Sequence, residues 1–252
     1  MPKRKPTFHL SAYYPRKAMT REAFARFWAQ MARAPFEARK YDDVERMKLA
    51  FSPDGESRAY RKLELGLLMV RGKGLAYFVQ DRSSIDRLMF QMEPGSMGER
   101  SREQWLSWFV DLFDILSVVF AFGCLETEFD AKHTISFQGP DGGWQSDDSG
   151  FRPNDFKAAL PGVYWLNYYG SEIGEHLGER IAKNDDMVVT ELSRNRFLAM
   201  LKEPLTPTDL DARLVLERKI AADIGPDYFF DKQSPSSKKR QVPGLAALFG
   251  SA

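Results

Sequence analysis

The residues best able to do chemistry in this sequence are carboxylates gathered in its middle third. The stretch 138–156 reads QGPDGGWQSDDSGFRPNDF and contains the aspartates Asp141, Asp147, Asp148 and Asp155. Such carboxylates could hold a divalent metal ion for hydrolysis, or they could attract a basic protein. A metal site needs its ligands on rigid elements, whereas this stretch is rich in glycine and shows no helix or strand period. We expect no metal site here, and a carboxylate-based metal-dependent hydrolase using this loop remains the alternative function.

The histidines and the cysteine offer little for catalysis. His176 follows Glu172 by four residues, so both could face one side of a helix, but HExxH order and a second nearby histidine are missing. Cys124 lies between Gly123 and Leu125 in an apolar stretch, which indicates a buried thiol rather than a nucleophile. No Gly-x-Ser-x-Gly motif occurs. We therefore expect a protein that is not an enzyme and that uses no cofactor.

The charge distribution singles out the same region. The 36 basic and 35 acidic residues nearly balance over the whole sequence. Between positions 121 and 191, however, there are 13 acidic residues and only 5 basic ones. Basic clusters at 3–5 and 238–240 could contact nucleic-acid phosphates, yet the acidic body would repel a duplex, so we interpret them as solvated tails. An acidic region beside nearly neutral flanks can steer a basic partner or simply aid solubility.

An acidic loop with one large aromatic residue suits a protein-binding surface. Trp144 would be the buried anchor of such a surface, and the carboxylates around it would guide the partner. Three more acidic residues precede the loop closely in sequence. The predicted partner-binding residues are Glu126, Glu128, Asp130, Asp141, Trp144, Asp147, Asp148 and Asp155.

The elements that must position these residues mix strands and helices without strict βαβ alternation. Strand patterns occupy 7–13, 46–51, 63–70, 75–79, 117–129, 133–137, 161–169, 187–192 and 197–201. Helix patterns begin after Thr20, after a Ser101–Gln104 capping box, at Gly170 and after Thr206, and a short helix is expected over 84–92. Hairpins outnumber crossovers, which predicts a single-domain α+β fold with a largely antiparallel sheet backed by helices.

The 252 residues suffice for one domain with a proper core. The longest uncharged apolar run, 115–125, is too short for a membrane span, and the opening MPKRKPTFHL does not resemble a secretory signal. A single cysteine forms no internal disulfide, so we expect a cytoplasmic protein. We expect a basic arm over 1–6, an α+β domain over 7–230 and a mobile basic tail over 231–252, in which 245–249 could dock as an apolar plug.

A resemblance to a known family appears in the segment 160–170, which reads LPGVYWLNYYG and is followed by Ile173, Leu177 and Gly178. It resembles the PG-x-x-W-x-N-(aromatic)-x-G … LG stretch of bacterial type VI secretion immunity proteins, which are paired with effectors carrying a VRR-Nuc nuclease domain. The order of elements over 100–230 is also similar to that family. Trp165 and Asn167 match the motif, and we expect Trp165 in the core and Asn167 as a hydrogen-bonding residue at a strand end or turn.

The resemblance implies a cytosolic antidote that binds a nuclease effector and blocks its active site. It does not locate the interface, so we place the interface on the acidic segment by physical argument. A nuclease cleft must attract a phosphate backbone and is therefore basic, and an acidic surface would raise the rate of association with it. We expect a nuclease effector as the partner, without direct contact to nucleic acid or membrane.

Overall fold

The computed structural model describes residues 6–79, 85–138, 144–148, 155–156, 158–193, 195–206, 209–230 and 242–245. Ten of its strands form one sheet in the order β11-β12-β10-β7-β1-β6-β5-β4-β2-β3, and every pairing in it is antiparallel. The strands are β1 (Phe8–Pro15), β2 (Lys40–Asp42), β3 (Leu49–Ala50), β4 (Leu67–Arg71), β5 (Gly74–Val79), β6 (Ile85–Met92), β7 (Phe120–Leu125), β10 (Leu166–Tyr169), β11 (Met187–Glu191) and β12 (Phe197–Leu201). The predicted antiparallel sheet is confirmed.

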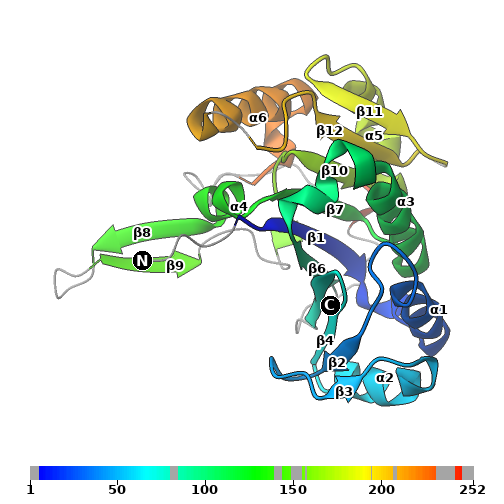
Figure 1. Cartoon of the computed structure of the whole chain (residues 1–252). Helices are drawn as coiled ribbons and strands as arrows, with labels where there is room; N and C mark the ends of the chain where they lie inside the picture. The colour runs from blue at the N-terminus through cyan, green and yellow to red at the C-terminus, as the bar shows by residue number, and fades with distance from the viewer. Residues whose placement is uncertain are drawn as a thin grey trace.

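The described ranges contain six α-helices beside this sheet, and α1, α2 and α3 lie along one side of it in Figure 1. They are α1 (Arg21–Met31), α2 (Glu56–Glu64), α3 (Glu99–Leu116), α4 (Glu126–His133), α5 (Ser171–Ala182) and α6 (Leu210–Ile224). The molecule is thus a single-domain α+β protein, as the sequence pattern predicts. No helix within the described ranges is long and apolar enough to cross a bilayer.

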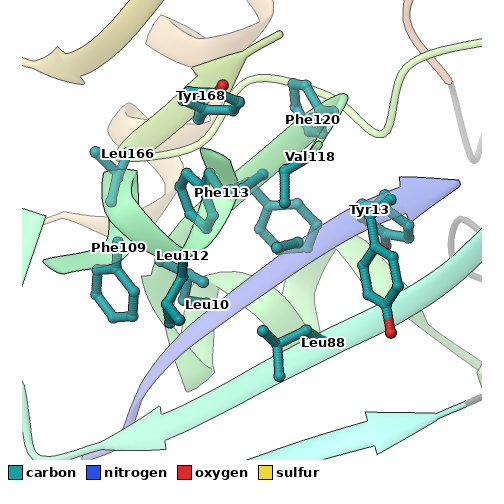
Figure 2. Close-up of a cluster of buried hydrophobic side chains, with 14 of the residues drawn as sticks. Leu10, Tyr13, Leu88, Phe109, Leu112, Phe113, Val118, Phe120, Leu166 and Tyr168 are labelled. Carbon is teal, nitrogen blue, oxygen red and sulfur yellow. The ribbon is translucent and has the colours of Figure 1, made fainter. Parts of the chain in front are cut away.

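Helix α3 packs against the centre of the sheet. Figure 2 shows Phe109 and Leu112 of this helix against Leu10 of β1, with Leu166 and Tyr168 of β10 beside them. All five side chains are buried. The helix presents apolar residues at 3.6-residue spacing, so one face enters the core while the other stays polar.

The helix starts are partly as predicted. Thr20 is the N-cap of α1, and its hydroxyl accepts a hydrogen bond from the Ala23 N–H at 3.1 Å. The predicted Ser101 capping box is wrong, because α3 begins earlier, and the Ser101 hydroxyl donates to the Ser96 carbonyl at 2.9 Å. Asp209, rather than the predicted Thr206, caps α6.

Several predicted elements have different bounds or a different type. Of the predicted strands 46–51 and 161–169, only β3 (Leu49–Ala50) and β10 (Leu166–Tyr169) are strands. Residues 85–92 form strand β6 rather than a helix, because β6 pairs with both β1 and β5 near the centre of the sheet. The predicted strand 63–70 begins only after Gly66, whose φ of 108° ends α2. The predicted strand 117–129 ends at Leu125, where the chain turns into helix α4.

The segment 138–156 also differs from the prediction of a structureless loop. It contains β9 (Trp144–Asp148), which pairs antiparallel with β8 (Thr134–Gln138) to form a separate two-stranded sheet. In Figure 1 this β8–β9 hairpin extends away from the ten-stranded sheet. Asp141 lies outside the described residues.

The residues of the aromatic motif have the structural roles expected of them. Trp165 is buried, and its indole N–H donates to the Glu203 carbonyl at 3.0 Å. The Asn167 side chain is buried and bonds both backbone groups of Tyr164, at 3.0 and 2.7 Å. Gly178 allows α5 to approach β12, since a Cβ there would lie 2.4 Å from the Phe197 ring.

The C-terminal region is described only over 242–245, so most of the predicted tail lies outside the described residues. Val242 and Leu245 are 2% and 1% exposed and belong to the hydrophobic core. Leu245 is the first residue of the predicted plug. At least this short segment packs against the domain.

Candidate partner-binding site

Helix α4 connects the main sheet to the β8–β9 hairpin, and its outer side carries two of the predicted residues. The Glu126 N–H donates to the Thr7 carbonyl at 2.8 Å, where α4 leaves β7. Asp130 is exposed, and Glu126 is half-buried. The two residues are four apart on a helix and therefore share a face.

Glu128 does not belong to this outer face, and the prediction that it binds the partner is wrong. Its side chain is 2% exposed, and its Oε2 lies 3.4 Å from Nη1 of Arg213 on α6. The error follows from the type of element. A strand would place Glu126 and Glu128 on one side, whereas a helix turns Glu128 away from Glu126 and Asp130.

Glu128 is part of a buried charged cluster that joins α4 to α6. Lys132 Nζ lies 2.5 Å from Glu217 Oε2 and 3.8 Å from Glu128 Oε1, and it sits 3.8 Å from the centre of the Tyr164 ring. Lys132 also donates to the Val163 carbonyl. These contacts hold the inner side of α4 against residues 163–164, just before β10, and against α6.

Arg213 completes the cluster from α6. Its side chain is fully buried, and its Nε donates to Glu203 Oε2 at 2.8 Å while Nη2 donates to the Pro204 carbonyl. Burial raises the pKa of Glu217 to about 8, with Lys132 opposing the shift and Glu128 adding to it. The buried Arg213 and the half-buried Lys132 thus face the carboxylates of Glu128, Glu203 and Glu217.

The register of the β8–β9 hairpin separates the acidic residues of β9. Asp147 pairs with Ile135, whereas Asp148 pairs with Thr134 and Trp144 pairs with Gln138. Successive residues of a strand alternate between the two faces. Trp144 and Asp148 therefore share one face of the hairpin, and Asp147 lies on the other.

Asp155 belongs to the body of the domain rather than to the hairpin. It is half-buried, and its carbonyl accepts from the N–H groups of Ala158 and Ala159 at 2.8 and 2.9 Å. The next residue, Phe156, is fully buried and lies 5.2 Å from the Tyr13 ring. The structure thus gathers five predicted residues on α4 and the attached hairpin: Glu126, Asp130, Trp144, Asp147 and Asp148.

Sequence reasoning missed one residue beside the outer face of α4. The His9 ring stacks on Phe129 of α4 with 5.3 Å between the centroids. Burial lowers the pKa of His9, against the opposing effects of Glu126 and Asp130. The pairing of β1 with β7 brings His9 to this place, and its position in the sequence gives no sign of it.

The described residues include no group of three or more histidine, cysteine, aspartate or glutamate side chains that could hold a metal ion. Lys132 and Arg213 lie among the carboxylates of the buried cluster, where a cation would otherwise be needed. The arrangement suits charge-guided binding on the outer side of α4 and structural ion pairing on its inner side.

Comparisons with known proteins bear on the fold. No protein-family model matches the chain, and no curated protein matches it. Among solved structures it is similar to the Pseudomonas aeruginosa T6SS protein PA0821, with a TM-score of 0.55 and 13% sequence identity. The similarity covers 97% of this chain and 80% of that chain. At this identity the similarity shows that the two proteins share a fold.

Proposed function

We propose that this protein is an immunity protein that binds a cognate type VI secretion effector with a VRR-Nuc nuclease domain and blocks its active site. The observation that carries the proposal is the fold similarity to a T6SS protein over 97% of the chain. The aromatic motif at 160–170, which resembles the immunity family, spans the approach to β10, β10 itself and Gly170, directly before α5.

The acidic outer side of α4 and the β8–β9 hairpin supports the choice of a basic partner. A nuclease must bind a phosphate backbone, so its cleft carries positive charge. Between 126 and 148 the chain has six acidic residues, and its only lysine or arginine is Lys132, which is paired inside the cluster. A surface of this kind would speed association and favour the effector over proteins with neutral surfaces.

Under this proposal the protein acts in the cytoplasm as an inhibitor without catalytic activity of its own. It would need no cofactor and would contact neither nucleic acid nor membrane. A metal-dependent hydrolase gains no support from the hairpin register, because adjacent residues Asp147 and Asp148 lie on opposite faces of the strand.

The test is co-expression with the product of the neighbouring reading frame, followed by co-purification. We expect a toxic, nuclease-like neighbour to be neutralised and to purify as a stable complex. A neighbour that is neither toxic nor bound would contradict the proposal. Titration with Mg²⁺ and Mn²⁺ separates the alternative, since a hydrolase would bind the metal and gain activity, whereas an inhibitor would show neither.

A further inference from the structure

A pocket of about 320 Å³ opens at the edge of the ten-stranded sheet, where β2 and β3 meet the start of α2. The polar side chains that line it belong to Tyr41, Ser52, Asp54, Ser57, Arg58 and Arg61. In Figure 1, α2 and β3 lie together at the end of the sheet opposite to β11. Four strands separate β2 from β7, which leads into α4. The pocket is therefore separate from the proposed partner-binding surface.

Two arginines of α2 supply positive charge to this pocket. Arg58 and Arg61 are both exposed, and they are three residues apart on the helix, so their side chains are neighbours. Among the described residues, neither guanidinium has an ion pair or a hydrogen bond. Lys62 of the same helix, by contrast, is paired with Asp42 and Asp43. Neighbouring like charges repel each other, and an anion bound between them would remove this repulsion.

Two serine hydroxyls add further donors to the pocket. The Ser57 Oγ accepts a hydrogen bond from Nη2 of Arg21 at 2.7 Å, which leaves its own hydrogen for another acceptor. The Ser52 hydroxyl has no partner within the described ranges, while the Ser52 carbonyl accepts from the Trp28 indole N–H at 2.9 Å. Both serines lie at the start of α2, where the helix dipole favours negative charge. The pocket thus presents several donors that have no acceptor.

The number of donors indicates which anion fits. Arginine guanidinium groups bind phosphate through paired N–H donors, and a phosphate ester offers three terminal oxygens and up to two negative charges. A carboxylate offers two oxygens and one charge, fewer than two guanidinium groups and two hydroxyls can bind. The volume lies at the small end of the range for ligand pockets, about 300–1,000 Å³, so the ligand is small.

We propose that this pocket binds a small phosphate ester. Arg58 and Arg61 would contact the phosphate oxygens, and the hydroxyls of Ser52 and Ser57 would donate to them. The only carboxylate of the lining is that of Asp54, which opposes the anion and lowers its affinity. This activity goes beyond the proposed function, which uses α4 and the β8–β9 hairpin.

Isothermal titration of the full chain tests the proposal, with inorganic phosphate, glycerol 3-phosphate and acetate compared at one ionic strength. Both phosphates should bind saturably at one site, and acetate should not bind over the same concentrations. Arg58→Gln and Arg61→Gln should each weaken phosphate binding at least fivefold. Arg218→Gln is the matched control, since Arg218 is exposed on α6, and it should change the affinity less than twofold.

Asp54→Asn gives a measurement in the opposite direction. It removes the opposing charge and should tighten phosphate binding at least twofold, with a melting temperature within a few degrees of wild type. Three results would overturn the proposal: no saturable binding of either phosphate, equal binding of acetate, or the same loss of affinity in Arg218→Gln as in Arg58→Gln.

Discussion

Removing the charge of Arg213 should destabilise the protein strongly, because its side chain is fully buried among its ion-pair partners. Arg213→Met keeps most of the side-chain volume and removes the bonds to Glu128, Glu203 and the Pro204 carbonyl. Glu128 is 2% exposed, and the cation that it would keep among its described ion pairs is Lys132, at 3.8 Å. Losing one member of a buried ion pair costs about 3–5 kcal/mol, because the other charge stays buried.

This cost can be measured by urea and thermal unfolding. For a chain of this length, 1 kcal/mol corresponds to about 2–4 °C, so the melting temperature should fall by roughly 6–20 °C. Arg218→Met, at an exposed position of the same helix, is the control and should change stability by less than about 0.5 kcal/mol. The double variant Glu128→Gln/Arg213→Met removes both charges and should be more stable than Arg213→Met alone. A single variant within about 1 kcal/mol of wild type, or a double variant less stable than the single one, would refute this reasoning.

Three further predictions concern other parts of the molecule. The pKa of Glu217 rises from 4.5 to about 8 on folding, so its contribution to stability is complete below about pH 4.5 and is lost as pH rises towards 8. Glu217→Gln should abolish this loss, which urea unfolding at pH 5 and pH 8 measures. Equal pH dependence of stability in the wild type and the variant would contradict the prediction. Leu245→Ala should cost about 2–5 kcal/mol because the side chain is 1% exposed, and unchanged thermal stability would show that the C-terminal contact is dispensable. Glu126→Lys/Asp130→Lys should slow association with the proposed effector at least tenfold at low salt and less at high salt, measured by stopped flow; a loss that does not depend on salt would argue against steering.

Much of the architecture can be predicted from the sequence because the apolar periods are long and clear. The pair β11–β12 and the cap at Thr20 follow from local patterns of residues 187–201 and 20–31. The strand 85–92 could not be told from a helix, since Leu88, Phe90 and Met92 fit the strand period while Ile85, Leu88 and Met92 fit the helix period. Its pairing on both sides, which is a long-range property, decides the outcome.

The candidate site was predictable in composition but not in arrangement. Glu126, Glu128 and Asp130 look equivalent in sequence, and only the turn from β7 into α4 separates the buried residue from the other two. Arg213 lies 85 residues from Glu128 in the chain. A helical pattern containing an arginine gives no indication that the arginine is buried, because its buried partners come from other elements.

Ion pairs neutralise part of the negative charge of the segment 121–191. At the α5 end, Glu179 pairs with Lys183 at 2.6 Å and Asp186 pairs with Lys219 at 2.5 Å, so much of the field there is cancelled. Within α4 and the two described strands of the hairpin, the one lysine is directed inward to Glu217, and these elements contain no other lysine or arginine. Steering of a basic partner should therefore act through α4 and the hairpin rather than through the whole acidic segment, because exposed charges beyond about 8 Å are screened at physiological salt.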